Sequence, residues 1–325
     1  MTIELSCAFA TSPESHEHAR IAESLGYRRA FFFDSPALYP DVWVQLCRAA
    51  ERTERIGLGP GMLIPSLRHP MTSAAAIATL AGLAGAARVV VGVGAGFTGR
   101  LAMGQRAMRW SDVAAYVRTL RGLLRGEQVL WEGNPIQMLH TPGFVPPRPL
   151  EVPFLIAAGG PKGIAVAREV GDGIAGVRMP IGGFAWSIAF TFGTVLADGE
   201  NPGAERPLAA AGHGAAVMLH GSAERGRLDT LLPEQGRQWL AAYDAVPAES
   251  RHLAMHYGHL VLVNTHDRPY ITGELLTKFG LARSAAGWRE RLAQMEEAGA
   301  TEVAYQPAGP DIARELEAFI NAARG

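Results

Sequence analysis

The sequence has little cysteine, almost no lysine and no excess of charge of one sign. Its 325 residues include two cysteines, Cys7 and Cys47, which form no metal-binding spacing and suit a reducing compartment. Lysine occurs only at Lys162 and Lys278, a bias that we attribute to codon composition. The formal net charge is −1, so the chain has no strong field to attract a polyanion. These absences argue against a disulfide-rich secreted domain and against nucleic acid as a partner.

Long apolar runs are also missing. No stretch approaches the roughly 20 apolar residues that a membrane-spanning helix needs. The opening residues, MTIELSCAFA, lack the basic segment and long apolar core of a signal peptide. We therefore expect a cytoplasmic protein with no membrane partner.

What the sequence does have is a regular alternation of apolar strand-like runs and amphipathic helix-like runs. The predicted strands cover residues 3–9, 29–33, 56–64, 88–93, 151–157, 172–177, 215–219 and 302–305. The predicted helices cover residues 12–25, 41–55, 71–84, 111–125, 162–170, 186–196, 234–243, 286–298 and 311–323. About eight such alternations favour a parallel sheet that is covered by helices and closed on itself, an α/β fold of the TIM (β/α)8 barrel type.

The alternation weakens between residues 179 and 277. No linker, low-complexity run or block of like charge divides the chain elsewhere. We therefore predict one domain over residues 1–325, with an insertion region at about 179–277, before the last strand. The earlier stretch 127–149 is rich in proline and predicts a hairpin or an extended excursion.

The third predicted strand is interrupted by Gly59, Pro60 and Gly61. Glycine inside a strand marks either a bulge or a place where another group meets the backbone directly. This strand end is followed by a loop and a helix, the arrangement that carries sites in parallel α/β proteins. His69 stands just before that helix, and we expect it to cap the helix or brace the loop.

Two glycine-rich turns follow later strands. Residues 94–99 match GxGxxG, but no acidic residue follows at the spacing of a dinucleotide-binding fold, so we favour a flexible loop at the barrel mouth. Residues 157–161, AAGGP, end a strand and open a helix. Free backbone N–H groups at such a helix start favour a phosphate, and Arg178 after the next strand can add a charged hydrogen bond. A tight turn without a ligand is the alternative.

The histidines offer no convincing ligand set. His252, His256, His259 and His266 cluster in sequence, yet no HExxH or second motif accompanies them. We predict no metal. No GxSxG motif supports a serine nucleophile either.

Together, three stretches and the C-terminal region resemble the bacterial luciferase-like superfamily of flavin and F420 enzymes, most of all its methylene-tetrahydromethanopterin reductase branch. The stretches are GPGMLIPSLRHP (59–70), AAAIATLAGLAGAARVVVGVGAG (74–96), PFLIAAGGPKGIAVAREVGDGI (153–174) and AGWRERLAQMEEAGATEVAYQP (286–307). The resemblance implies a TIM-like barrel, usually dimeric, with F420 or FMN across the C-terminal strand ends. It also implies a bulge with a non-prolyl cis peptide at Gly61-Met62, behind the flavin ring.

The resemblance assigns cofactor-binding positions residue by residue. Gly159 and Gly160, with Arg178, fall at the phosphate site. The positions beside the ring are Asp34, Gly61, Met62, Ala95 and Gly96. Ser35 is expected to hydrogen-bond the ring or the substrate, and Tyr39, Trp43 and His140 to line the substrate side.

The sequence also departs from the family pattern. Sugar-phosphate dehydrogenases of the superfamily carry Asp-His after the second strand, where this chain has Asp34-Ser35. An acid that F420 enzymes often place after the fourth strand is replaced by Phe97. His256 and His259 are the remaining acid/base candidates. Both departures argue against sugar-phosphate oxidation, which needs a base for the hydroxyl proton.

We expect an oxidoreductase that moves a hydride between reduced F420, or FMN, and a small organic substrate. One alternative is a two-component FMN monooxygenase that uses O₂ and a separate flavin reductase. The other is a barrel that binds a flavin or another ligand without turnover.

Overall fold

The structure is a computed structural model that describes residues 3–228, 232 and 234–325. Its chain forms two compact units. Unit 1 comprises residues 1–101, 105–191 and 294–305, and unit 2 comprises residues 102–104, 192–293 and 306–325.

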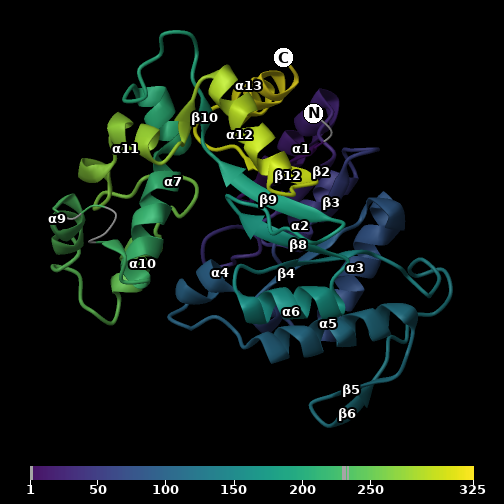
Figure 1. Cartoon of the computed structure of the whole chain (residues 1–325). Helices are drawn as coiled ribbons and strands as arrows, with labels where there is room; N and C mark the ends of the chain where they lie inside the picture. Colours follow the sequence, from purple (N-terminus) through teal and green to yellow (C-terminus); the bar gives the residue numbers. More distant parts are fainter. Residues whose placement is uncertain (1–2, 229–231, 233) are drawn as a thin grey trace. The chain divides into compact units, whose positions relative to one another are not determined.

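Unit 1 is built on one parallel sheet of eight strands (Figure 1). In chain order the strands are β1 (Glu4–Phe9), β2 (Arg29–Phe32), β3 (Gly57–Pro60), β4 (Val91–Gly94), β7 (Phe154–Ala157), β8 (Gly173–Val177), β9 (Ser187–Phe192) and β12 (Glu302–Gln306). The sheet order is β3-β2-β1-β12-β9-β8-β7-β4. Apart from β3 and β4, which stand at the two ends, strands that follow one another in this chain order therefore lie side by side, and the first strand, β1, lies beside the last, β12. Parallel bridges from Leu58 to Val89 and from Leu63 to Val93 join the two outer strands. The sheet thus returns on itself, and the predicted (β/α)8 barrel is confirmed.

The barrel interior is a packed core. One buried cluster takes a single residue from the β-strand region of six different chain segments: Ala8, Phe31, Val90, Leu155, Ile188 and Ala304. Phe31 is the only aromatic residue among these six, and its ring packs tilted against that of Phe190, with ring centroids 5.3 Å apart. Alternating large and small side chains in this way fill a barrel of eight strands without leaving a pore.

Gly59 shows why the third strand contains glycine. A Cβ atom added there would lie 1.6 Å from the carbonyl oxygen of Val90, which no side chain can accept. The neighbouring backbone, and not a ligand, therefore excludes a side chain at this position. The close approach lies where β3 meets β4 and the barrel closes.

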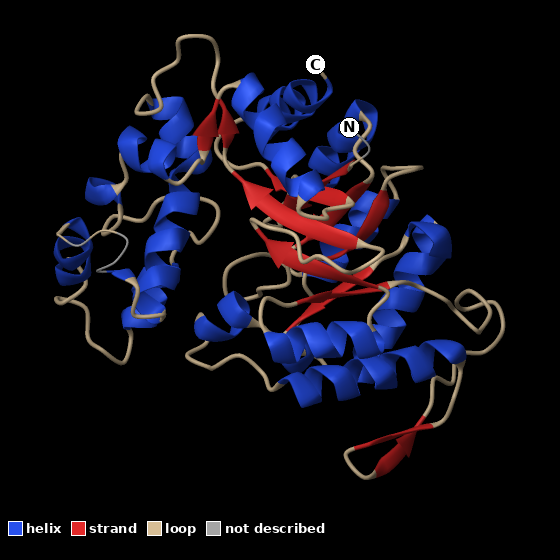
Figure 2. Ribbon diagram, viewed as in Figure 1, coloured by secondary structure: helices blue, strands red, loops and turns tan. Residues whose placement is uncertain are grey.

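Helices cover the outside of unit 1 (Figure 2). They are α1 (Ser15–Leu25), α2 (Val42–Ala50), α3 (Pro70–Ala84), the short α4 (Phe97–Leu101), α5 (Trp110–Arg125) and α6 (Pro161–Val170), with 3-10 turns η1 (Pro65–Leu67) and η2 (Ala86–Arg88). The longer helices pack in sequence order, α1 on α2, α2 on α3, α3 on α5 and α5 on α6.

Side chains fix where these helices begin. The Asp41 carboxylate accepts from the backbone N–H groups of Trp43 and Val44 and caps α2. His69 Nδ1 accepts from the backbone N–H of Met71 at 3.2 Å, which confirms the predicted capping role. The predicted start of the first helix at residue 12 is wrong, because α1 begins at Ser15.

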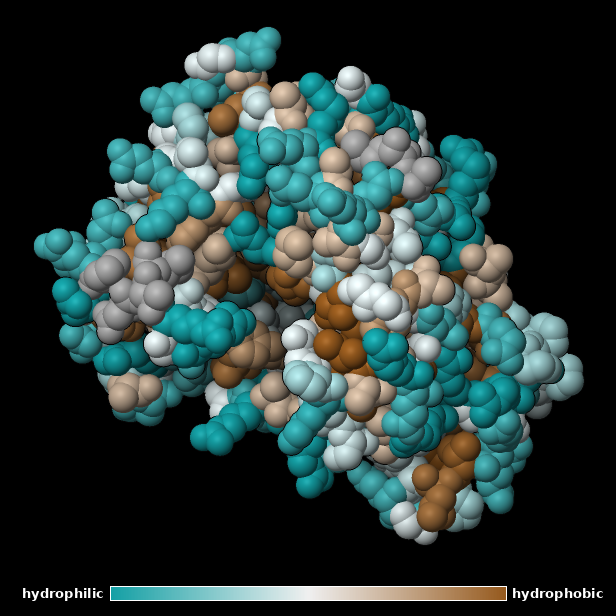
Figure 3. Space-filling model, viewed as in Figure 1, coloured by the Kyte–Doolittle hydropathy of each residue, from teal (hydrophilic) through white to brown (hydrophobic). Residues whose placement is uncertain are grey.

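The excursion after α5 contains the predicted hairpin. Strands β5 (Val129–Trp131) and β6 (Asn134–Ile136) pair antiparallel. Figure 3 shows a hydrophobic patch over this hairpin, where Leu130 is 72% exposed.

Unit 2 has its own hydrophobic core around Trp239, Tyr243 and Leu276. Its elements are β10 (Thr194–Val195), α7 (Glu205–Glu224), α9 (Gln235–Ala241), α10 (Arg251–His256), η3 (Arg268–Tyr270), α11 (Gly273–Lys278), β11 (Ala282–Arg283) and α13 (Ile312–Arg324), while α12 (Ala285–Glu297) runs across the boundary between the units. No described helix has the length and hydropathy to cross a membrane.

Two secondary-structure predictions in this region are wrong. Residues 215–219 belong to helix α7, which buries alanine and glycine on several sides and so shows no helical period. Residues 186–196 form β9 and β10, consistent with their β-branched and aromatic content. Because β9 is a barrel strand, the proposed insertion cannot start at residue 179. One domain with an insertion stays a proposal, with residues 229–231 and 233 of that stretch outside the described residues.

Candidate active site

A non-prolyl cis peptide joins Gly61 and Met62 immediately after β3. The backbone N–H of Gly61 donates to the carbonyl of Phe32 at 2.8 Å, which ties this turn to β2. The Met62 side chain lies over β4, because a Cβ added at Gly92 would lie 2.6 Å from its Sδ atom. The cis bond stands where the family resemblance places it.

A buried carboxylate lies at the end of β2. Arg68 Nη1 donates to both oxygens of Asp34, at 2.8 and 2.6 Å, and the backbone N–H of Ile64 lies 3.4 Å from Oδ2. Arg68 Nη2 reaches Asp41 Oδ2 at 2.8 Å. The Asp34 side chain is 1% exposed and that of Asp41 is 48% exposed. Arg68 therefore holds the β2 and β3 loops together through a largely buried ion pair.

The pKa of Asp34 is raised above its ordinary value. Burial is the main cause, since it disfavours the charged carboxylate, and the hydrogen bonds and charge of Arg68 oppose it. Asp41 has a lowered pKa, because its bonds from Arg68 and from the α2 backbone outweigh its partial burial. The two carboxylates thus share one guanidinium but differ in environment.

The loop after β4 contains a short helix that the sequence does not predict. Helix α4 starts at Phe97, directly after Ala95 and Gly96. The Ala95 carbonyl accepts from the backbone N–H of Met108 at 2.8 Å. A Cβ added at Gly99 would lie 3.0 Å from the Ser35 hydroxyl oxygen, so the β2 and β4 loops touch.

The glycine turn after β7 is open. A Cβ added at Gly159 or Gly160 would meet no atom within 4 Å. Gly160 is the N-cap of α6 and offers no side chain to its first N–H groups. Arg178, after the adjacent strand β8, has φ 67°, a left-handed conformation that is uncommon for arginine. Its backbone N–H donates to the Phe190 carbonyl at 2.6 Å. The turn therefore has open space beside both glycines, and the phosphate site at Gly159, Gly160 and Arg178 stays a prediction.

The residues predicted to line the substrate side have different surroundings. Tyr39 and Trp43 are each 8% exposed, and burial raises the pKa of Tyr39. The Trp43 Nε1 atom is buried and has no hydrogen-bond partner among the described residues. His140 is exposed, with Nδ1 3.1 Å from Arg148 Nη2.

His140 lies at the wrong end of the barrel for the predicted role. It belongs to the connection from α5 into β7, which enters β7 at its amino end. Gly159 follows the carboxyl end of the same strand. Since sites of this fold form at the carboxyl ends, the structure contradicts the substrate-lining prediction for His140.

His256 and His259 lie in unit 2, both buried, with their Nδ1 atoms 3.4 Å apart. Burial lowers the pKa of His256 to about 4, and that of His259 well below its ordinary value. Both imidazoles are therefore neutral at pH 7. Their predicted role as acid/base groups stays a prediction.

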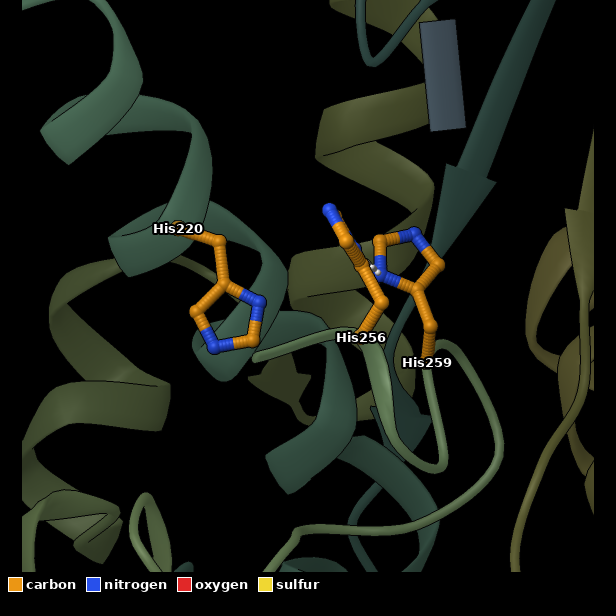
Figure 4. A group of neighbouring side chains, drawn as sticks. All are labelled: His220, His256 and His259. Carbon is orange, nitrogen blue, oxygen red and sulfur yellow. Dashed lines mark hydrogen bonds between the residues drawn. The ribbon is translucent and has the colours of Figure 1, made fainter. Parts of the chain in front are cut away.

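Tertiary structure brings together residues that sequence reasoning missed. Arg68 is the partner of Asp34, and no local pattern in the sequence indicates which carboxylate Arg68 contacts. His220 joins His256 and His259 from helix α7 (Figure 4). No spacing rule connects it with the later histidines.

The sequence of the chain is similar to that of known proteins over about its first 190 residues. The family model of luciferase-like monooxygenases matches residues 10–191. An F420-dependent glucose-6-phosphate dehydrogenase of Beutenbergia cavernae is 34% identical over 171 residues, which cover 47% of this chain and 49% of the relative. A 5,10-methylenetetrahydromethanopterin reductase of Archaeoglobus fulgidus is 29% identical over 166 residues, 50% of this chain and 48% of the relative. The chain thus matches about half the length of these relatives.

Solved structures share the fold over nearly the full length. The coenzyme F420 dependent tetrahydromethanopterin reductase from Methanopyrus kandleri matches with a TM-score of 0.67, 17% identity and 98% coverage of both chains. An F420-dependent secondary alcohol dehydrogenase, solved with an F420-acetone adduct, matches with a TM-score of 0.66, 16% identity and full coverage of both. At these identities the likeness supports the barrel fold alone.

Proposed function

The chain belongs to the luciferase-like monooxygenase family, and from that premise we propose that it is an oxidoreductase that transfers a hydride between reduced F420 and a small organic substrate. The observation that carries the choice of cofactor is the sequence likeness to F420-dependent glucose-6-phosphate dehydrogenases, at 31–34% identity over about half the chain. Structural neighbours named as F420-dependent are consistent with it.

The residues at the carboxyl strand ends fit such a cofactor. The open turn at Gly159 and Gly160 leaves room for a phosphate beside the N-terminus of α6. The ends of β3 and β4 carry Gly61, Met62, Ala95 and Gly96, the positions that the family resemblance places beside a flat ring. We propose that these residues hold the cofactor, with Arg178 and Asp34 beside it.

Reduced F420, when bound, supplies the hydride, and the protein binds the cofactor and the substrate and orients them. Asp34 is held by Arg68 and so maintains the loop geometry. Ser35 offers a hydroxyl that donates or accepts one hydrogen bond, but it cannot act as a base near neutral pH. A sugar-phosphate alcohol would need that base, so we propose reduction of an electron-poor substrate in preference to sugar-phosphate oxidation.

The alternatives keep the same site. A two-component FMN monooxygenase would use reduced FMN, O₂ and a separate reductase, and the name of the matching family favours keeping it as an alternative. A barrel that binds the ligand without turnover would explain the replaced acid/base residues. We further propose a cytoplasmic homodimer, which sedimentation of the purified protein would test.

A binding titration separates these readings. The full chain is titrated with F420 and with FMN, each followed by its fluorescence. Tighter binding of F420, together with oxidation of reduced F420 by a substrate from a screen of alkenes and imines, supports the proposal. Preferential FMN binding with substrate-dependent O₂ consumption would support the monooxygenase, and binding without any turnover the non-catalytic barrel.

Substitutions in the glycine turn test the phosphate site. Gly159→Asp places a carboxylate where the phosphate is proposed, and repulsion of about 2–3 kcal/mol would weaken cofactor binding roughly 30- to 150-fold. Gly159→Ala is the matched control, because its methyl group meets no atom within 4 Å and should leave both the fold and the affinity nearly unchanged. Equal affinity of the aspartate and alanine variants would remove Gly159 from the site.

A further inference from the structure

Three buried histidines in unit 2 converge on one point. One ring nitrogen from each of His220, His256 and His259 lies within 4.8 Å of those of the other two. The Nδ1 atoms of His256 and His259 are 3.4 Å apart. A tetrahedral zinc ion with Zn–N bonds of about 2.0–2.1 Å holds its ligand nitrogens roughly 3.4 Å apart. The distance between the His256 and His259 nitrogens therefore already suits zinc coordination. The distances from the His220 nitrogen to the other two are at most 4.8 Å and would have to shorten toward roughly 3.4 Å.

His220 is oriented as a ligand. Its Nε2 atom lies 3.0 Å from the Asp267 carboxylate, while its Nδ1 atom is buried and has no hydrogen-bond partner among the described residues. Figure 4 shows the nitrogen next to the stem of the His220 side chain turned toward His256. Metal-bound histidines nearly always give their second ring nitrogen to a carboxylate, a carbonyl or water. The Asp267–His220 pair has that arrangement.

The carboxylate is itself held in place. Trp239 Nε1 and the Tyr243 hydroxyl each donate to Asp267 Oδ1 at 2.7 Å. The Asp267 side chain is 1% exposed, and its pKa is lowered despite this burial, first by the hydrogen bond from His220 and then by those from Trp239 and Tyr243. Asp267 is thus a fixed anion that keeps Nε2 of His220 protonated and leaves Nδ1 as the lone-pair donor.

His256 repeats the pattern more loosely. Its Nε2 atom lies 3.9 Å from the Glu224 carboxylate, and its Nδ1 atom faces His259. Two of the three histidines therefore have a carboxylate behind the ring and a second nitrogen toward the common point. A hydrogen bond between the two neutral imidazoles accounts for their contact alone, but it leaves Nδ1 of His220 unexplained.

We propose that His220, His256 and His259 bind one divalent transition-metal ion of the zinc class, with water in the fourth position. Neutral imidazoles suit zinc, copper and nickel, whereas the harder calcium and magnesium prefer oxygen ligands. The ion would tie helix α7 to helix α10 and to the turn that follows it, so its role is to stabilise unit 2. The sequence-based expectation of no metal failed to consider His220, which lies in a different helix.

Metal binding by the purified full chain tests the proposal. After treatment with a chelator and its removal, the protein should take up one Zn²⁺ per chain in competition with a fluorescent zinc indicator. Zn²⁺ should also raise the melting temperature, because only the folded chain presents the site. His220→Gln should lose zinc affinity at least 100-fold. His252→Gln, in the same helix α10 as His256 but outside the cluster, should bind like the wild type.

A second variant covers the case in which His220→Gln fails to fold. Asp267→Asn keeps all three ligands, and loss of its charge should weaken zinc binding 10- to 100-fold while one ion per chain is retained. Co²⁺ added to the wild type should give the visible absorption of tetrahedral coordination, which Zn²⁺ should abolish. Absence of zinc uptake by the wild type, or unchanged affinity in folded His220→Gln, would overturn the proposal.

Discussion

Replacing Arg68 by methionine should expose how much unit 1 depends on one ion pair. The variant keeps an apolar stem of similar length but removes the guanidinium from Asp34, whose side chain is 1% exposed. The carboxylate would keep only the backbone N–H of Ile64 at 3.4 Å. Loss of one partner of a buried pair typically costs about 3–5 kcal/mol, so we expect the free energy of unfolding to fall by that amount at pH 8.

The pH dependence of Arg68→Met has a definite sign. Burial already raises the pKa of Asp34, and removal of Arg68 takes away the influences that oppose it. An acid with a pKa higher in the folded than in the unfolded state binds protons preferentially when folded. The variant should therefore recover stability as the pH falls from 8 toward 5.

Urea unfolding followed by circular dichroism would measure both effects. The double variant Asp34→Asn/Arg68→Met should recover most of the loss, because it leaves no buried charge. Asp41→Asn is the control: its side chain is 48% exposed and asparagine still caps α2, so it should cost less than about 1 kcal/mol. A loss below about 1 kcal/mol in Arg68→Met at pH 8 would refute the reasoning.

Two further predictions concern buried groups away from this pair. Glu302, 0% exposed, accepts from Arg29 Nη1 at 2.5 Å and from Trp186 Nε1 at 2.9 Å, so Glu302→Ala should cost about 3–5 kcal/mol in urea unfolding. Exposed Glu4→Ala, which removes the other partner of Arg29, should cost under about 1 kcal/mol, and equal costs would contradict the prediction. Burial lowers the pKa of His213 to about 4, so its contribution is present above about pH 6.5 and falls by about 2 kcal/mol between pH 7.5 and 5. His213→Gln should show a correspondingly weaker pH dependence, and an unchanged one would exclude His213 as its source.

The barrel was predictable from sequence because its signal is local and repeated. Seven of the eight strands in unit 1 were predicted as short apolar runs bounded by glycine, proline or a helix cap, and those features act within a few residues. The remaining strand, β9, was predicted as a helix. His69 is an example, since its position before the helix was enough to predict that it caps the helix or braces the loop, and the structure shows the cap.

Unit 2 and the side-chain clusters depend on information that is not local. Helix α7 is buried on several sides, so its alanines and glycines lack the period that distinguishes a helix from a strand. The pairing of Arg68 with Asp34 and of His220 with His256 joins distant chain segments through the packing of the fold. His140 shows the converse error, because a plausible residue type says nothing about which end of a barrel it occupies.

The close approach of strands β3 and β4 at Gly59 limits which substitutions this enzyme can accept. Alanine, the smallest alternative, would already set a methyl carbon 1.6 Å from the Val90 carbonyl oxygen. In a library randomised at this position, only the variants that keep glycine should fold. At Gly159 an added Cβ would meet no atom within 4 Å, so many residue types should be accepted there. Directed evolution of cofactor or substrate preference should vary the residues of the open turns and leave unchanged the residues where β3 meets β4.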